Sequence, residues 1–379
     1  MKKTCSLLAA LLASAALMTA CASDDTVVEN ETTTDESMET AESTSEAGQT
    51  ATIVLGDSIE IDGEGAEVSD GGVLISKAGT YTISGELEEG MIHVDVTDAE
   101  VELVLNGVDI SSSTGPAILF MNTSEAVVTL AEGTANSLSD GGDSEYDGAL
   151  YSTGTMTIQG DGALNVVGNA EEGIASEMHL NIDGGTIHIS SADDGMNANN
   201  DGVSVITING GYLFIEAGGD GIDSNGALTI NGGTVIALGS LTDANGGLDA
   251  DGDVTITGGT VIATGEKLST PTTSSSQKSV IIDFGSTQQA STIASIQQGG
   301  TQLLNFAPAL NYRCLLYSSD ALAEDVSYDV YSGGSATGDN GDGIFETGSY
   351  TGGTLVDSIT TDSISSYGGG VPGPGGMGR

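Results

Sequence analysis

Acidic and amide side chains recur at short glycine turns in the middle of the chain, where their oxygens could bind a cation. The turns align on Gly173, Gly195, Gly221 and Gly247. The residues just before these glycines form one column: Glu172, Asp194, Asp220 and Gly246. The residues two positions after them form a second: Ala175, Asn197, Asp223 and Asp249. Carboxylate and amide oxygens are the ligands that hard divalent cations prefer.

Calcium suits these turns best, because Ca²⁺ takes six to eight oxygen ligands in flexible geometry, whereas Mg²⁺ resists dehydration. Stacked carboxylates would repel by roughly 3 kcal/mol per contact at an effective dielectric of about 20. Either solvent screens them, in turns whose Asx side chains bond their own backbone, or a cation lies between them. We expect Ca²⁺ as the cofactor, with ligands drawn from Asp193, Asp194, Asn197, Asp220, Asp223, Asp243, Asn245, Asp249 and Asp251.

Short strands must hold these turns in register. Each of four Gly-Gly pairs lies between two strand-like runs, and the pairs step by 26, 22 and 26 residues: Gly184-Gly185, Gly210-Gly211, Gly232-Gly233 and Gly258-Gly259. A period in the twenties is typical of a solenoid, in which each repeat forms one coil. Alternation along the strands points aliphatic side chains inward. The sequence therefore predicts an all-β solenoid.

One outward row of the expected coils is unusually apolar. It contains His188, Phe214, Ile236 and Ile262. Outward side chains of a solenoid normally face water, so we expect either another segment or a ligand to cover this row.

The N-terminus reads as an export signal followed by a lipid anchor. Residues 1–20 combine two lysines with a short apolar segment, and the run LMTAC resembles a bacterial lipobox ending at Cys21. Diacylation of Cys21 would attach the protein durably to a membrane, and the alternative is cleavage with free release. Residues 21–50 are rich in Ser, Thr and Glu and predict a lipidated, disordered tether.

Four further regions are expected along the chain. Residues 51–266 form the β-helix, and residues 267–278 form a polar linker. Residues 279–367 form a small β region that caps the open end of the solenoid, and residues 368–379 form a flexible tail. If Cys5 is removed with the signal and Cys21 is lipidated, no intramolecular disulfide is possible, and we expect Cys314 as a small apolar strand residue.

The charge balance bears on the class of protein. The chain has 7 Lys and Arg against 55 Asp and Glu, which disfavours nucleic acid and anionic lipid as partners. Residues 78–266 contain no Lys or Arg, which removes the usual base of lyases that share this architecture. A hydrolase needs two carboxylates about 5 to 10 Å apart, and the many acids leave that possibility open. His93, His179 and His188 are expected as side chains on the helix wall.

The ordered motifs resemble one family. ISKAGTYTISGEL, VELVLNGVDI, GPAILF, VTLAEGTANSLSDG, the DGI and DGM turns with TINGGT, and SYDVYSGG resemble the bacterial carbohydrate-binding parallel β-helix family of surface proteins, over residues 52–334. The resemblance implies a right-handed parallel β-helix related to pectate lyases, with bound Ca²⁺. Its acidic turns fall on Asp193-Asp194-Gly195 and Asp220-Gly221-Ile222-Asp223, whereas Asn245-Gly246-Gly247 lacks the Asp before the glycine.

The resemblance further implies binding to cellulose-like or acidic plant polysaccharide such as pectin, without established catalysis. We expect a monomeric lipoprotein, exported and anchored to the bacterial cell envelope or surface, that binds polysaccharide and is not an enzyme. Its contact with a membrane would be through the lipid alone. The alternatives are a weak polysaccharide lyase or hydrolase, and a structural or adhesion protein.

Overall fold

The computed structural model describes residues 49–142, 144–346 and 348–361. The expected signal peptide, Cys21, nearly all of the tether and the C-terminal tail lie outside these ranges. The described residues form strands and turns, as an all-β sequence predicts, and none of them belongs to a helix that could cross a membrane.

One side of the fold is a nine-stranded sheet. Seven neighbouring strand pairs within it are parallel, and only the terminal β3–β4 pair is antiparallel. Its strands in chain order are β3 (Ala66–Ser69), β4 (Gly72–Ile75), β6 (Ile92–Asp95), β8 (Ile118–Met121), β11 (Gly148–Ser152), β14 (Glu172–Ser176), β17 (Met196–Ala198), β20 (Ile222–Ser224) and β23 (Leu248–Ala250).

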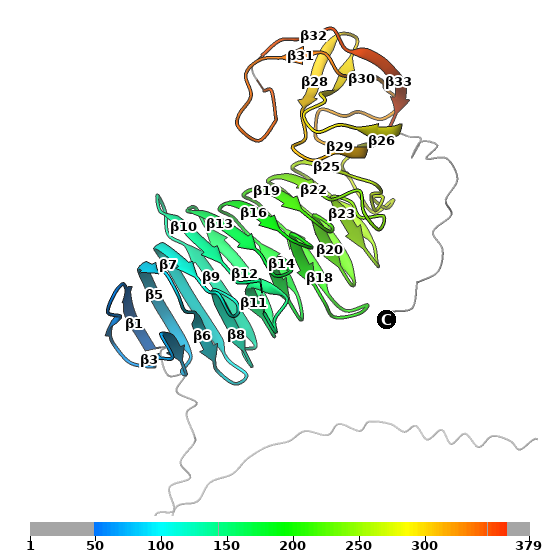
Figure 1. Ribbon diagram of the computed structural model, residues 1–379. Helices are drawn as coiled ribbons and strands as arrows, with labels where there is room; N and C mark the ends of the chain where they lie inside the picture. The colour runs from blue at the N-terminus through cyan, green and yellow to red at the C-terminus, as the bar shows by residue number, and fades with distance from the viewer. Residues whose placement is uncertain (1–48, 143, 347, 362–379) are drawn as a thin grey trace, which may run out of the picture. The chain divides into compact units, whose positions relative to one another are not determined.

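Two further sides belong to a larger sheet. One side stacks β9 (Glu125–Leu130), β12 (Thr155–Gly160), β15 (Leu180–Ile182), β18 (Val205–Ile208), β21 (Ala227–Ile230) and β24 (Val254–Ile256). The other stacks β10 (Ala135–Ser139), β13 (Ala163–Gly168), β16 (Thr186–Ser191), β19 (Tyr212–Ala217), β22 (Thr234–Leu238) and β25 (Thr260–Gly265). Figure 1 shows these ladders of strands lying side by side. Each coil contributes one strand to every side, so the fold is a parallel β-helix.

The first coils are more irregular. Long strands β5 (Gly79–Leu87) and β7 (Glu100–Ser111) run through both sides of the larger sheet, because β7 pairs with β9 and also with β10. At the N-terminal end, β1 (Gln49–Leu55) pairs with β5 in parallel and with β2 (Glu60–Asp62) antiparallel.

The Gly-Gly pairs lie at the corner between the two sides of the larger sheet. The second glycine of each pair has a positive φ, between 80° and 90°, which is strained for residues with a Cβ. At Gly211 a Cβ would also lie 2.7 Å from the carbonyl oxygen of Gly185 in the neighbouring coil. Glycine at this corner thus satisfies both the turn and the close stacking of coils.

The core of the helix consists of the inward aliphatic side chains that the alternation predicted. Leu180 and Ile182 precede one glycine pair, and Ile187 and Ile189 follow it. All four are at most 2% exposed. Because side chains alternate along a strand, a slip by one residue would turn this row outward, so burial fixes the register of each coil.

The C-terminal region is built from antiparallel strands. Strand β29 (Tyr312–Ser318) pairs with β25 of the last coil and with β26 (Ser279–Gln288). The other strands are β27 (Ala294–Gln298), β28 (Thr301–Phe306), β30 (Ser327–Ser332) and β33 (Thr354–Thr360) in one sheet, and β31 (Ser335–Ala336) and β32 (Tyr350–Thr351) in another. Cys314 is fully buried in β29, as expected, and its Sγ donates to the carbonyl of Glu266.

The C-terminal region covers most of the apolar outward row. Phe214, Ile236 and Ile262 belong to a second hydrophobic core together with C-terminal residues such as Phe306 and Tyr317. Ile236 and Ile262 are fully buried and Phe214 is 9% exposed. The sequence predicted that either another segment or a ligand covers this row. In the structure a segment of the same chain, the C-terminal region, covers it.

Residues 267–278, the expected linker, run along the last coil. The amides of Ser269, Thr272 and Gln277 donate to the carbonyls of Leu248, Val254 and Ile256, at 2.9, 2.8 and 3.2 Å. These bonds satisfy backbone groups of β23 and β24 that the end of the stack would otherwise leave open. The segment therefore takes the place of a further partial coil.

Candidate functional site

The backbone register stacks the second acidic column along the outward face of the nine-stranded sheet. Ala175 pairs with Asn197, Asn197 with Asp223, and Asp223 with Asp249. Strands β14, β17, β20 and β23 supply one residue each, although the turn before β23 is longer than the other three. The alignment agrees with that predicted from the turns.

The first column is held by hydrogen bonds between coils. The amide of Gly195 donates to the carbonyl of Asp220, at 2.9 Å. Side chains add a second link: Asp194 Oδ1 accepts from the amide of Asp220 at 2.6 Å, and Asp220 Oδ1 accepts from the amide of Gly246. In each of these two carboxylates, one oxygen therefore accepts a hydrogen bond from the next coil, and the other oxygen can interact with further partners.

Burial disfavours the ionised form of these carboxyl groups. It raises the pKa of Asp194 to about 6, that of Asp220 to about 7 and that of Asp223 to about 8. Repulsion within the group adds to the effect, and Asp249 contributes to all three shifts. Since residues 78–266 lack Lys and Arg, no nearby side chain of that segment can compensate the charge. A cation or protons must do so.

Glu172 continues the first column toward the N-terminus. It is only 7% exposed, and burial raises its pKa to about 8. Its Oε2 has no hydrogen-bond partner among the described residues. The alignment of the turns with one another placed Glu172 in the first column. Glu172 was not among the expected ligands, since nothing in its local sequence marks a buried carboxyl.

Asn197 presents an unused oxygen beside Asp194, Asp220, Asp223 and Asp249, which together form the acidic group. Its Nδ2 donates to Asp194 Oδ2 at 3.2 Å, whereas its Oδ1 is buried and has no partner in the described structure. A buried amide oxygen without a partner costs about 1 to 3 kcal/mol. Oxygen donors of this kind fit Ca²⁺.

Side-chain carboxylates alone do not complete a metal site. No three His, Cys, Asp or Glu side chains within the described ranges are arranged to hold a metal ion. The donor set therefore fits Ca²⁺ only with Asn197 and turn carbonyls as additional ligands.

The remaining expected ligands lie around this group. Asp193 and Asp251 are exposed, and their charges raise the pKa values of Asp220 and Asp223 respectively. Asp243 is exposed with φ 52°, and Asn245 donates its amide to Thr242 in the same long turn after β22. The structure thus gathers the ligands expected from the first two turns and from β23, and leaves Asp243 and Asn245 in a turn of their own.

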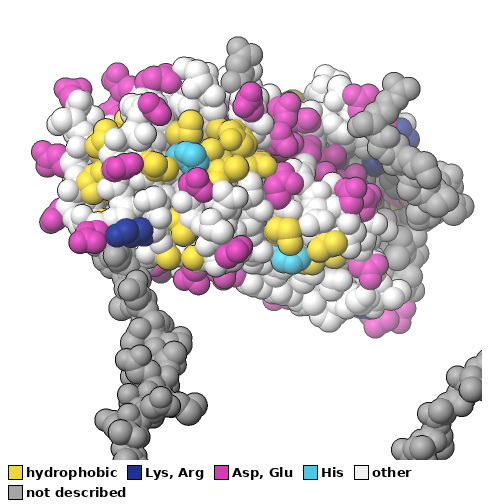
Figure 2. All heavy atoms as spheres, turned by 90° about the horizontal axis from the view of Figure 1, so that it is seen from below, with side chains coloured by type: hydrophobic (Ala, Val, Ile, Leu, Met, Phe, Trp, Pro, Cys, Tyr) yellow, Lys and Arg dark blue, Asp and Glu magenta, His cyan; other side chains and the backbone are white. Residues whose placement is uncertain are grey.

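The same outward row is apolar at its other end. Leu119 pairs with Tyr151, and Tyr151 with Ala175, next to Asn197. Tyr146 packs against Tyr151 with ring centroids 5.3 Å apart, and the Tyr151 hydroxyl donates to Glu177 at 2.7 Å. Figure 2 shows hydrophobic side chains gathered on one face of the molecule, with acidic side chains beside them. Sequence reasoning missed this aromatic end, because Tyr146 lies outside the repeats.

Comparison with known proteins assigns the family. A family model described as carbohydrate-binding domain-containing protein matches residues 69–309, which is more than half of the chain. The chain belongs to this family. The match includes every strand from β4 to β28 and therefore the whole acidic group.

Two individual proteins are similar to this family member. A carbohydrate-binding domain-containing protein of Acetivibrio thermocellus is 34% identical over 137 residues, which are 34% of this chain and 48% of the relative. The chain thus spans about half the length of that curated relative. A solved structure, described as the polysaccharide lyase-like protein from C. thermocellum in a gadolinium derivative, has 31% identity and a TM-score of 0.47, covering 56% of this chain and 93% of that chain.

Proposed function

We propose that this protein binds polysaccharide along the outward row of β11, β14, β17, β20 and β23, and that Ca²⁺ at the acidic end holds acidic sugar units. The observation that carries the proposal is the buried, unpartnered Oδ1 of Asn197 beside Asp194, within a group of carboxyls that burial makes poor anions. Membership of a carbohydrate-binding family supports the choice of ligand class.

The protein residues have distinct parts in this proposal. Asp194, Asp220, Asp223 and Asn197 hold the cation, and the bonds from the amides of Asp220 and Gly246 fix the orientation of two of these carboxylates. Bound Ca²⁺ would neutralise the carboxylates and offer remaining coordination positions to the carboxylate of a uronic acid unit. Tyr151 lies further along the same row and is only 7% exposed, and the partly exposed ring of Tyr146 packs against it, where a sugar face could stack.

Retention on immobilised polygalacturonate tests the proposal. We expect retention in millimolar Ca²⁺, loss in excess chelator, and weakening of about tenfold or more for Asp223→Asn, which removes one ligand charge. Asp161→Asn is the matched control, because Asp161 is an exposed turn carboxylate outside the acidic group. Unchanged retention in chelator would show that Ca²⁺ does not bridge the protein and the polymer.

A hydrolase is the second candidate, and Glu172 is the observation that favours it. A carboxyl with a pKa of about 8 stays protonated at neutral pH, as a general acid requires. Release of reducing ends from polygalacturonate, lost in Glu172→Gln, would establish this activity. Binding without release of sugar ends favours the binder. A glycan array without a hit favours a purely structural or adhesive role.

We also propose that Cys21 carries a lipid anchor, which holds the protein at the cell envelope or surface. A tether of the length between Cys21 and β1 would let the helix reach insoluble polymer from a fixed point. We further propose that the protein acts as a monomer, which size-exclusion chromatography with light scattering would test.

A further inference from the structure

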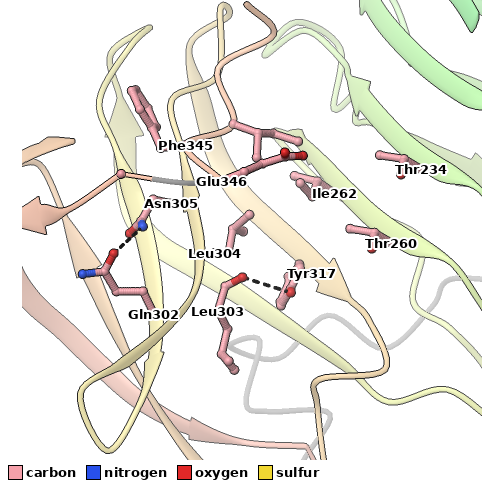
Figure 3. Close-up of a pocket in the computed structure, with 12 residues that line it drawn as sticks. Thr234, Thr260, Ile262, Gln302, Leu303, Leu304, Asn305, Tyr317, Phe345 and Glu346 are labelled. Carbon is pink, nitrogen blue, oxygen red and sulfur yellow. Dashed lines mark hydrogen bonds between the residues drawn. The ribbon is translucent and has the colours of Figure 1, made fainter. Parts of the chain in front are cut away.

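A cleft separates the wall of the β-helix from the C-terminal region, away from the acidic group. Its volume is about 380 Å³, within the range of small-molecule sites. Figure 3 shows Thr234 and Thr260 approaching from β22 and β25, opposite residues of β28 and the loop that follows β31. The polar and aromatic side chains that line it include Thr234, Thr260, Gln302, Asn305, Tyr317 and Phe345.

Asn305 lines this cleft and carries a buried side-chain atom without a hydrogen bond. It is 5% exposed, and its Nδ2 donates to Gln302 Oε1 at 2.8 Å. Its Oδ1 is buried and has no partner in the described structure. Turning the amide of Asn305 by 180° would exchange the roles of its two atoms and leave the other one unpaired. In either orientation this buried group lacks one bond, and a ligand or a water could supply it once the side chain turns toward the cleft.

The other lining groups suit a neutral, hydroxyl-rich ligand. Thr234 and Thr260 can each donate and accept through one hydroxyl. The ring of Phe345 is half-exposed, and aromatic rings pack favourably against flat apolar faces. Glu346 adds a carboxylate at the rim, whereas no Lys or Arg lines the cleft. A negatively charged rim disfavours an acidic ligand but can accept hydrogen bonds from hydroxyls.

We propose that this cleft is a second carbohydrate site, which binds a neutral hexopyranose unit without Ca²⁺. Asn305 and Gln302 would bond the hydroxyls of the sugar on one side, and Thr234 and Thr260 would bond them on the other. The apolar face of the sugar ring would pack on Phe345. The site shares no residue with the acidic group, so it goes beyond the function proposed above. A neutral polymer and an acidic polymer would therefore bind at different places.

Because the sequence contains no Trp, the fluorescence of one introduced Trp can report binding at the cleft. Phe345→Trp introduces a single indole at the cleft. We expect its fluorescence to shift on titration with cellohexaose, xylohexaose or mannohexaose in excess chelator. No shift with any of the three, together with no heat of binding by the unmodified protein, overturns the proposal. Loss of the response in chelator would also overturn it, because the cleft is proposed to act without metal.

Variants of the unmodified chain locate the binding. Thr260→Val and Gln302→Ala remove a hydroxyl and an amide with little risk to folding, and each should weaken binding of the responding hexaose by about tenfold. Thr255→Val is the matched control, since Thr255 is an outward strand residue of β24, outside the cleft lining. Equal affinities for all three variants would place the ligand elsewhere. Polygalacturonate retention in Ca²⁺ should stay unchanged in Thr260→Val, which separates this inference from the function proposed above.

Discussion

The hydroxyl of Tyr212 donates a hydrogen bond of 2.6 Å to Oδ2 of Asp342, which lies 130 residues further along the chain. The same oxygen lies 3.3 Å from Nε2 of His188 on the neighbouring strand. Tyr212 and His188 belong to the wall of the β-helix, and Asp342 belongs to the loop between β31 and β32. A polar contact thus joins the two regions beside their shared hydrophobic core.

Tyr212→Phe should therefore loosen the attachment of the C-terminal region. The bond is charge-assisted but only partly buried, so we expect a loss of about 1 to 2 kcal/mol in the free energy of unfolding, measured with denaturant. Tyr146→Phe is the control, because the hydroxyl of Tyr146 has no hydrogen bond to another described residue. Equal stabilities for the two variants would contradict a stabilising role for the Tyr212–Asp342 bond.

The shared hydrophobic core should be the stronger attachment. Ile262 is fully buried between the last coil and the C-terminal region, so Ile262→Ala should cost about 2 to 4 kcal/mol. Val203→Ala truncates a side chain that is 52% exposed and should stay within about 0.5 kcal/mol of the parent. A cost at Ile262 as small as that at Val203 would show that the C-terminal region does not pack there in solution.

Removal of metal should make stability depend on pH in one direction. The folded protein holds carboxyls with pKa values of about 6 to 8, against an ordinary value of 3.8 for Asp. Between about pH 4 and pH 8 the folded state then binds more protons than the unfolded state, so metal-free stability falls as pH rises. We expect a higher melting temperature at pH 5 than at pH 8 in metal-free buffer, and a smaller difference in Ca²⁺.

Asp223→Asn tests the source of that slope. It removes a carboxyl whose pKa burial raises to about 8, so the dependence on pH should flatten. Asp161→Asn removes one negative charge elsewhere and reports the general effect of lowering the net charge of −48. If both variants flatten the slope equally, repulsion across the whole surface explains it and the acidic group does not.

Lipidation at Cys21 predicts a simple labelling result. Cells supplied with radioactive palmitate should label the parent protein, and the membrane fraction should retain it. Cys21→Ala should abolish the label. Cys314→Ala is the matched control, because Cys314 is buried in β29 and cannot carry a lipid in the folded protein. Label that persists in Cys21→Ala would rule out this anchor.

The β-helix could be predicted from the sequence because its repeats share one pattern, which assigns the corner and the inward positions in every coil. Gly184-Gly185 and Gly210-Gly211 mark the same corner in successive coils, and alternation around them places Ile187 and Leu213 in the core. The acidic columns followed from the same alignment. The ion itself did not, since ligand geometry depends on side-chain directions that spacing does not specify.

The C-terminal region was less predictable for physical reasons. Its strands do not repeat, so nothing in the sequence reveals that β29 pairs with β25. Residues 267–278 lack the aliphatic alternation of a strand, yet their amides bond to the last coil, because backbone bonds need no side-chain pattern. The cleft around Asn305 combines residues from three distant segments and has no local signal.

The pairing of β25 with β29 has a consequence for how such chains can change in length. Strand β29 pairs with the free edge of the last coil, and each coil of 22 to 26 residues presents its successor with nearly the same corner and the same inward row. Duplication or loss of one coil before those that carry His188, Tyr212 and Phe214 would leave intact both the start of the helix and the surface under the C-terminal region. The number of coils can therefore differ between such chains, and with it the length of the row that we propose to bind polysaccharide.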